Sequence, residues 1–297
     1  MPTGLSRRRR RANTKTEESV TSARIPATIS ARAPYAWMLL GSMSFATMST
    51  LAHGLGDKND WQLIALARSG TAFLIAAILA KAAGVRLVFR SPKILWMRSL
   101  AGSLSVVCTF YALARPEVPA ANTLTLTNMF PLWVALLCWP LYGHRPTPAL
   151  VLALACGLGG VALIQQPHLA NGDYAVIAAL LASCATAVAM LGLHRLQAID
   201  PRAIVVHFSG VSTFVCLFCF LVFERKSTGV PAPQPRALLM LFAVGVTATI
   251  GQLFLTKAFV AGSPTRVSLV ALTQIPLVML FDVVIWRHSF NWLTLLG

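Results

Sequence analysis

Hydrophobic residues in this chain gather into long runs, which short segments with charged residues, proline or glycine separate. Runs of about 20 residues fit α-helices that cross a bilayer, whereas barrel strands alternate over about 10 residues. The pattern predicts nine full spans, near residues 35–55, 61–84, 93–114, 119–142, 147–165, 173–196, 201–223, 236–260 and 264–287. Residues 291–297 are expected to begin a truncated tenth span. We therefore predict an all-α polytopic membrane protein.

The composition agrees with this fold class. Of the 297 residues, 56% are hydrophobic and 11% are charged, and the mean hydropathy is +0.69. Soluble domains carry about 25% charged residues. The net charge of +16 is dispersed between the apolar runs, so it does not form the basic surface that a nucleic-acid partner requires. The expected surroundings of the chain are a lipid bilayer.

Residues 1–34 are polar and basic, with five consecutive arginines at positions 7–11. They predict a disordered cytosolic tail, with an organellar import sequence as the alternative. If the N-terminus is inside, 18 Lys and Arg residues fall in inside segments and six in outside segments. Arg98 is counted there with the inside connection between the second and third spans. The bias favours a multi-pass protein of the inner (cytoplasmic) membrane with a cytosolic N-terminus.

Short sequence matches recur in the same order in the two halves of the chain, 139 to 145 residues apart. They pair Tyr35-Ala36 with Tyr174-Ala175, Ser44-x-Ala46-Thr47 with Ser183-x-Ala185-Thr186, Ser69-Gly70 with Ser209-Gly210, and Pro131-Leu132 with Pro276-Leu277. Each repeat holds five spans, and an odd number of crossings inverts the second repeat relative to the first. We predict a first repeat over 35–167 (spans 1–5) and a second over 168–297 (spans 6–9 and the start of 10).

Pro131 and Pro276 lie near the middle of the fourth and ninth predicted spans. A proline inside a helix removes a hydrogen bond and kinks the chain, and bilayers tolerate this where protein or water satisfies the freed carbonyl. Asn128 and Gln274 lie within one turn of these prolines, and an amide at this depth is costly against lipid. The pattern predicts a central substrate site between the repeats. The alternative is that the prolines bend helices for packing and the amides bridge neighbours.

Several motifs resemble those of the EamA-type families of the drug/metabolite transporter superfamily, which are ten-span exporters, over residues 35–297. They are Arg98-Ser99-Leu100-Ala101-Gly102, Phe110-Tyr111-Ala112-Leu113-Ala114, Pro119-Ala120-Ala121-Asn122-x-Leu124, and Pro131 with the apolar run to Gly143. The resemblance implies two five-span repeats, alternating access, and a cavity lined chiefly by spans 3, 4, 8 and 9 alongside 1 and 6. Gly143-His144 and Arg287-His288 depart from the Gly-Glu that the family usually places after spans 4 and 9.

Arg68 and Asp282 are charges within predicted spans, each about 10 Å from the outer end of its helix. A charge at the bilayer centre costs about 2.5 to 3.5 kcal/mol on insertion scales. An ion pair, or an outer gate that opens when Asp282 is protonated, is one prediction, and snorkelling of both side chains to the interface is the alternative. Trp133 and Tyr111 are candidates to stack on a substrate, with ordinary packing as the alternative.

The residues do not predict an enzyme, a cofactor or a metal site. Asp282 is the only carboxylate within a predicted span, so the paired carboxylates of acid–base catalysis are missing. Cys216 and Cys219 form a C-x-x-C without a second pair of ligands, which favours buried thiols. The segment Gly157-x-Gly159-Gly160 gives the fifth span a small-residue face, a candidate homodimer seam.

The function that these features predict is secondary transport. The chain contains no Gly-Lys-Ser/Thr, so no ATP-binding loop is expected. The energy would come from a gradient, such as that of protons, or from the concentration difference of the substrate itself. We predict export of a small organic metabolite or drug by alternating access, and an inactive truncated relic or a non-transporting scaffold is the alternative. Few interior charges argue against a multi-phosphate substrate, while amino acids, sugars and hydrophobic cations remain open.

Overall fold

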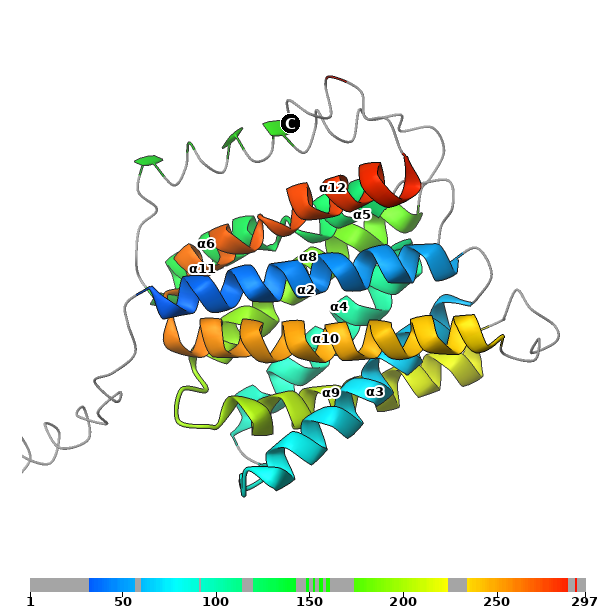
Figure 1. The fold of residues 1–297 in the computed structure, drawn as a ribbon. Helices are drawn as coiled ribbons and strands as arrows, with labels where there is room; N and C mark the ends of the chain where they lie inside the picture. The colour runs from blue at the N-terminus through cyan, green and yellow to red at the C-terminus, as the bar shows by residue number, and fades with distance from the viewer. Residues whose placement is uncertain are drawn as a thin grey trace, which may run out of the picture. The chain divides into compact units, whose positions relative to one another are not determined.

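The computed structural model describes residues 32–56, 60–90, 92–113, 120–142, 174–223 and 234–287, together with positions 148–149, 152, 155–156, 159–160 and 292. From residue 34 onward the described residues belong to one compact unit. Regular structure in these ranges is entirely helical (Figure 1). The helices are α2 Ala33–Gly56, α3 Trp61–Ala82, α4 Lys93–Leu113, α5 Ala120–Thr127, α6 Phe130–Tyr142, α8 Tyr174–His194, α9 Pro201–Val222, α10 Pro235–Ala261, α11 Pro264–Ala271 and α12 Gln274–Trp286.

Eight of the nine predicted spans coincide with these helices, within two residues at each end. Most of the span at 147–165, including Gly157 of its Gly157-x-Gly159-Gly160 seam, lies outside the described residues, as do residues 1–31 of the tail and all of the tenth-span segment except Trp292. Six described helices are long and apolar enough to cross a membrane, and Thr125–Trp139 forms a shorter apolar stretch. The all-helical, polytopic part of the prediction is therefore supported.

Proline and aspartate mark where several helices begin. Pro201, Pro235 and Pro264 occupy the first turn of α9, α10 and α11. A backbone N–H at this position has no hydrogen-bond partner within the helix, so proline, which lacks the N–H, loses nothing there. At the start of α9 the Asp200 carboxylate also accepts a hydrogen bond of 2.8 Å from the backbone N–H of Arg202. These local signals explain why the helix boundaries could be predicted closely.

Large apolar side chains cover the outside of the bundle, and small polar ones lie inside it. Exposed examples are Ile78, Ile177, Phe214, Leu221 and Leu239, whereas Ser42, Ser99, Ser183, Ser212 and Thr256 are fully buried. Several interior hydroxyls donate to the carbonyl one turn earlier in their own helix, as Ser103 does to Ser99 at 2.8 Å. An apolar exterior around hydroxyl-rich contacts is the arrangement expected of helices packed in lipid.

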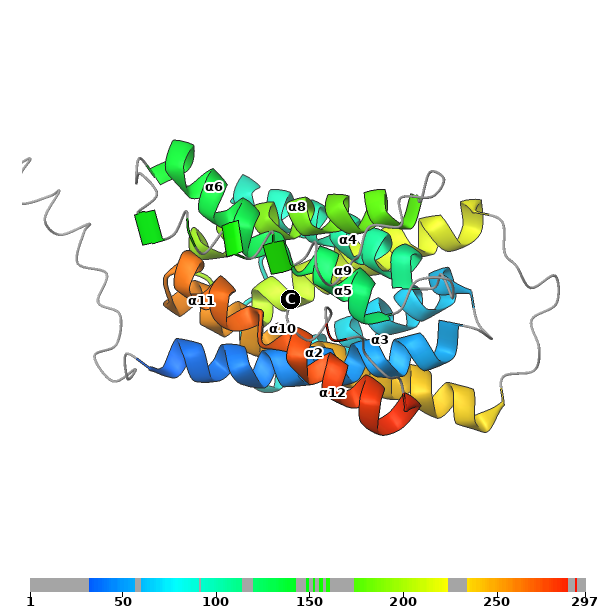
Figure 2. The same ribbon diagram turned by 90° about the horizontal axis from the view of Figure 1, so that it is seen from above.

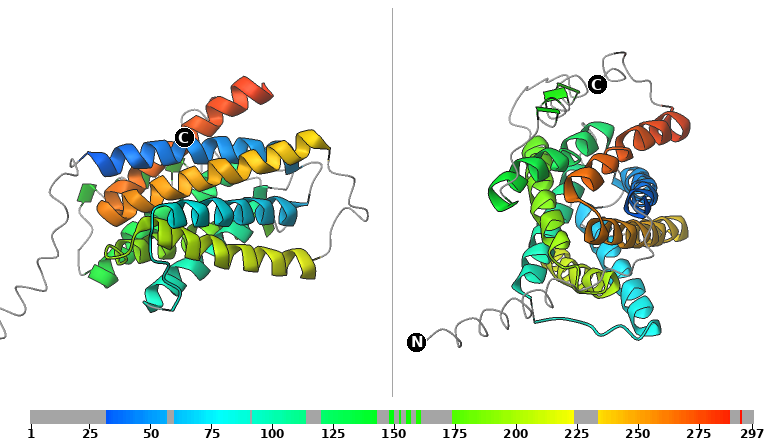
Figure 3. Two further views of the ribbon diagram at one scale, coloured as in Figure 1. Left: turned by 60° about the horizontal axis from the view of Figure 1, so that its bottom comes forward. Right: turned by 90° about the vertical axis from the view of Figure 1, so that its left-hand side faces the viewer.

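The helices pack as closely approaching pairs. Helix α4 contacts α8 and α9, and α3 contacts α9 and α10. Figures 1 and 3 show α2 beside α10, where Ser44 Oγ donates to the Thr247 carbonyl at 2.9 Å. At the same seam a methyl group on Gly41 would lie 3.4 Å from the Gly251 carbonyl oxygen, so only a small residue lets the two backbones come this near.

Two of the predicted spans are interrupted. Residues 128–129 separate α5 from α6, and residues 272–273 separate α11 from α12 (Figure 2). Tight i to i−3 bonds bridge both interruptions, from Met129 N–H to the Leu126 carbonyl and from Thr273 N–H to the Val270 carbonyl, each at 3.1 Å. The kinks expected at Pro131 and Pro276 are therefore breaks just before each proline. Both prolines fall in the first turn of the following helix, the position where proline costs least.

Candidate functional site

A cavity of about 140 Å³ lies inside the bundle, where both helix interruptions reach its wall. The interruption in the fourth span contributes Thr127 and Asn128, and the one in the ninth contributes Gln274. Helices α2, α3, α4, α6, α8, α9 and α10 supply the remaining lining residues. The two amides that the sequence singled out are thus brought to one cavity, and their contact with substrate remains a prediction.

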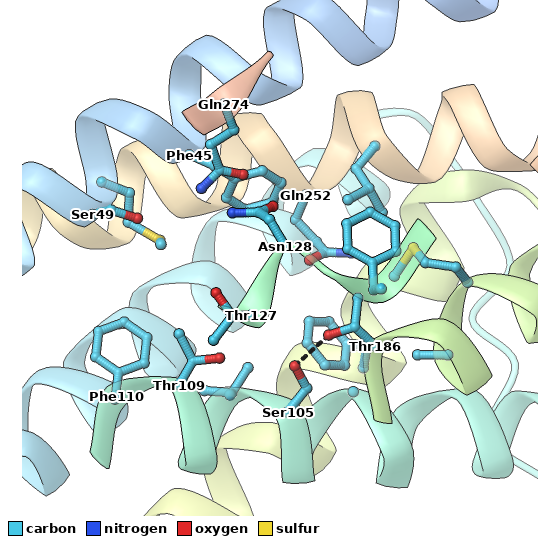
Figure 4. A pocket seen from close by; sticks show the side chains of 18 of the residues that line it. Phe45, Ser49, Ser105, Thr109, Phe110, Thr127, Asn128, Thr186, Gln252 and Gln274 are labelled. Carbon is cyan, nitrogen blue, oxygen red and sulfur yellow. Dashed lines mark hydrogen bonds between the residues drawn. The ribbon is translucent and has the colours of Figure 1, made fainter. Parts of the chain in front are cut away.

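Amides and hydroxyls place several polar groups on a cavity wall that is otherwise mostly apolar. Figure 4 shows the amides of Asn128, Gln252 and Gln274 facing the same part of the cavity, and all three residues are at least nine-tenths buried. Across from them, Ser105 Oγ and Thr186 Oγ1 form a hydrogen bond of 2.6 Å between α4 and α8. Polar groups on several helices can therefore orient a small molecule at this point.

Two arginines also line the cavity. Arg98 of α4 is 1% exposed and Arg68 of α3 is 6% exposed. The Arg98 guanidinium lies 4.0 Å from the centre of the Phe208 ring, and that of Arg68 lies 6.0 Å from the centre of the Phe110 ring. Nε of both arginines and Nη1 of Arg98 are buried with no hydrogen-bond partner among the described residues. The lining residues that the structure describes include no Asp or Glu.

A glycine makes room for the Arg98 side chain. A methyl group at Gly102, one turn further along α4, would overlap Arg98 Nη1 and approach Phe208 Cε2 to 2.7 Å. Residues four apart share one face of a helix. The Arg98-to-Gly102 spacing in the sequence therefore places the guanidinium over the glycine and against the Phe208 ring.

The other predicted site residues have different surroundings. The Tyr111 ring packs edge-on against Trp61 with centroids 5.7 Å apart, and Trp133 Nε1 donates to Ser183 Oγ at 2.9 Å. Neither ring is among the described lining residues of the cavity. Stacking of Tyr111 or Trp133 on a substrate remains a prediction, and the packing alternative accounts for both observed contacts.

The predicted partner of Arg68 and the two prolines can be placed only in part. The side chain of Asp282 lies outside the described residues, so its pairing with Arg68 stays a prediction. Arg68 is buried and lines the cavity, while the ion pair and the snorkelling alternative both remain predictions. Pro131, which follows the helix interruption at 128–129, is buried, whereas Pro276 is exposed on α12.

Among the charged and amide residues of the lining, sequence reasoning missed two, Arg98 and Gln252. Arg98 was grouped with the charges of the connection before α4, although it lies five residues after Lys93, inside the helix. The apolar run that begins at position 94 was the available signal. Gln252, like Asn128, is an amide within an apolar span. It was not singled out because no proline lies near it in the sequence.

Interrupted helices around a polar cavity, inside a bundle with an apolar exterior, define a polytopic membrane transporter. The chain belongs to the EamA-like transporter family, which matches residues 32–166 and 173–297. The resemblance drawn from the sequence motifs is therefore confirmed.

Individual relatives agree with this assignment. The pseudopaline exporter CntI of Pseudomonas aeruginosa, in strains UCBPP-PA14 and PAO1, is 29% identical over 232 residues, which cover 77% of this chain and 79% of the exporter. An uncharacterized transporter of Helicobacter pylori strain J99 is 26% identical over 192 residues, 64% of each chain. A protein of known crystal structure shares the fold with a TM-score of 0.70 and 19% identity, over 88% of this chain and 93% of its own.

Proposed function

We propose that the chain is a secondary transporter that exports a small organic molecule by alternating access. The observation that carries the proposal is that residues at two helix interruptions, Asn128 between α5 and α6 and Gln274 at the start of α12, line one cavity that holds buried amides. Broken helices leave backbone groups that only protein or a watery cavity can satisfy, and such sites bind substrates in secondary transporters. The family and its exporter relative support the direction of transport.

The contacts between helices support a pair of inverted five-span repeats. Helix α2 bonds to α10 through Ser44 and the Thr247 carbonyl, and α8 bonds to α4 through Thr186 and Ser105. Thr186 lies three residues after Ser183, the repeat counterpart of Ser44. If each span is replaced by its counterpart in the other repeat, the contact of α2 with α10 becomes the contact of α8 with α4, as a pseudo-two-fold axis requires. The contact of α3 with α10 is likewise the counterpart of that of α4 with α9.

The repeats set the proposed topology. The first repeat covers 35–167 and the second 168–297, with nine full spans and the start of a tenth. The N-terminus is cytosolic and the membrane is the inner one, in agreement with the distribution of Lys and Arg. Alternating access is then a rocking of one repeat against the other around the cavity, which the interrupted helices permit.

A vesicle experiment tests transport itself. Inside-out vesicles that contain the protein should accumulate a labelled metabolite from a panel faster than vesicles without it, with saturation. Asn128→Ala should slow accumulation, because the cavity loses one of its amides, whereas Phe214→Ala on the exposed face of α9 should not. If the wild-type protein moves no compound of the panel, or if both variants behave alike, the proposal is wrong.

The same vesicles test coupling to protons. A gate in which Asp282 pairs with Arg68 and opens on protonation predicts that Asp282→Asn abolishes the dependence of transport on a proton gradient. Reversing both charges, Arg68→Asp with Asp282→Arg, should retain more transport than either reversal alone. Unchanged gradient dependence would remove Asp282 from the coupling mechanism, and failure of the double reversal to rescue would remove the pair.

A further inference from the structure

The cavity carries positive charge that its described lining does not balance. Arg98 is almost completely buried, and the part of the lining that the structure describes includes no carboxylate. A guanidinium stays protonated in proteins, and a buried charge without a partner is costly. The proposed pairing of Arg68 with Asp282 would leave the charge of Arg98 to be balanced by something else.

The surroundings of Arg98 hold it in place without satisfying its hydrogen-bonding groups. Its guanidinium lies 4.0 Å from the centre of the Phe208 ring and packs over Gly102, neither of which offers a hydrogen-bond acceptor from its side chain. Nε and Nη1 have no partner among the described residues. The cation–π contact with the Phe208 ring offsets part of the cost of burying the charge. The ring does not accept the hydrogen bonds that the N–H groups donate in the plane of the guanidinium. A guanidinium binds carboxylates more strongly than neutral groups, so an anionic occupant of the cavity that Arg98 lines would offset its charge.

The rest of the cavity limits the size of the occupant. Its volume of about 140 Å³ is close to the roughly 150 Å³ of an engineered protein cavity that binds benzene. Phe45 and Phe110 give its wall apolar surface, and Ser49 adds a buried hydroxyl that has no partner among the described residues. An occupant with one ring-sized apolar part and one anionic group fits these walls.

We propose that the cavity selects small organic carboxylates, with the Arg98 guanidinium as the anchor of the carboxylate and Arg68 as a second cation on the wall. This inference deepens the proposed function, because it assigns a substrate class to the same cavity. It also excludes hydrophobic cations, which the sequence left open, since the unbalanced guanidinium of Arg98 repels them.

Three probes of matched shape test the charge preference. Benzoate, benzamide and benzylammonium share one ring and differ in carrying a negative, neutral or positive group. A ligand that binds the folded state raises the melting temperature with its concentration, so each affinity can be read from purified full-length protein. Benzoate should raise the melting temperature at concentrations where the other two have no effect. Equal stabilisation by benzamide or benzylammonium, or none by benzoate, would overturn the proposal.

Variants locate the anchor. Arg98→Gln should weaken benzoate binding about tenfold or more, because hydrogen bonds to charged groups are the strong ones. Arg98→Lys should keep part of the affinity, since the charge remains but the planar fork is lost. Lys257→Gln removes a basic residue of α10 that does not line the described cavity, and should bind as the wild type does. Full affinity in Arg98→Gln would contradict the role of Arg98.

Further readouts distinguish a variant that fails to fold from a failure of the carboxylate site, and a failure of the site from a failure of transport. If Arg98→Gln does not fold, two other results still test the carboxylate site. They are the comparison of the three ligands in the wild type and the binding of benzoate by the Arg98→Lys variant. If the protein binds benzoate but vesicles never accumulate it or another carboxylate, the proposed transport fails while the carboxylate site stands. If vesicles accumulate a neutral or cationic compound and Arg98→Gln does so at the wild-type rate, transport stands and the carboxylate site fails.

Discussion

At the scale of single residues, Gly102 decides where a buried charge can lie. The absence of a side chain at this position lets the Arg98 guanidinium and the Phe208 ring pack over the α4 backbone. Arginine in an apolar helix is costly, so a position that holds its long side chain inside the bundle is needed to keep it from lipid. A single glycine therefore makes room for one of the two buried arginines of the cavity.

Replacing this glycine by alanine should destabilise the protein. The added methyl group of Gly102→Ala overlaps Arg98 Nη1, and overpacking of this kind costs about 1 to 3 kcal/mol. Gly70→Ala is the matched control, because its methyl group would meet only Thr213 Cγ2, at 4.0 Å. Thermal melting of the two purified variants checks this, with a lowered melting temperature expected for Gly102→Ala alone. An equal response of both variants would contradict the role of Gly102.

At the scale of elements, the two interrupted spans place polar groups inside the bundle. Pro131 and Pro276 each lie in the first turn of the helix that follows a break, Asn128 lies within the first break, and Gln274 directly follows the second. The breaks could be predicted, because proline acts through its own covalent structure wherever the chain packs. Whether each proline faces inward could not, and Pro276 is exposed although Pro131 is buried.

Restoring the missing N–H should slow transport. In Pro131→Ala the residue regains a donor toward the Thr127 carbonyl, so α5 and α6 can join into a continuous helix and the cavity wall loses its hinge. Pro201→Ala changes a proline in the first turn of α9 and should leave the rate unaltered. Initial rates in vesicles, measured at equal amounts of folded protein, compare the two. A wild-type rate in Pro131→Ala would show that the break is not needed.

At the scale of the whole molecule, the helix contacts have the exchange symmetry that two inverted repeats would produce. The pairs α2 with α10 and α8 with α4 correspond, as do α3 with α10 and α4 with α9. In the proposed arrangement of two inverted repeats the cavity would have two related halves, and equivalent rocking of each half would open it to one side of the membrane at a time.

Labelling tests the inversion directly. Cysteines introduced at Ser6 and Gly172, in a background without the six native cysteines, should react with an impermeant reagent from opposite sides of the membrane. The reason is that five crossings separate the two positions in the proposed topology. Intact cells and inside-out vesicles provide the two sides, and a cysteine in place of Ala198, an exposed residue between α8 and α9, should react from the same side as Ser6. Reaction of positions 6 and 172 from one side would disprove the inverted arrangement.

The sequence by itself determined where the described helices begin and end, where two of them break, and which family the chain resembles. These properties depend on the length of apolar runs, on proline and on local motifs, all of which act along the chain. Only the tertiary structure decided that Arg98 and Gln252 join Asn128 and Gln274 at one cavity, and that Tyr111 and Trp133 turn toward Trp61 and Ser183. In a membrane protein the lipid-facing and the packed faces of a helix are both apolar, so periodicity does not reveal which face turns inward.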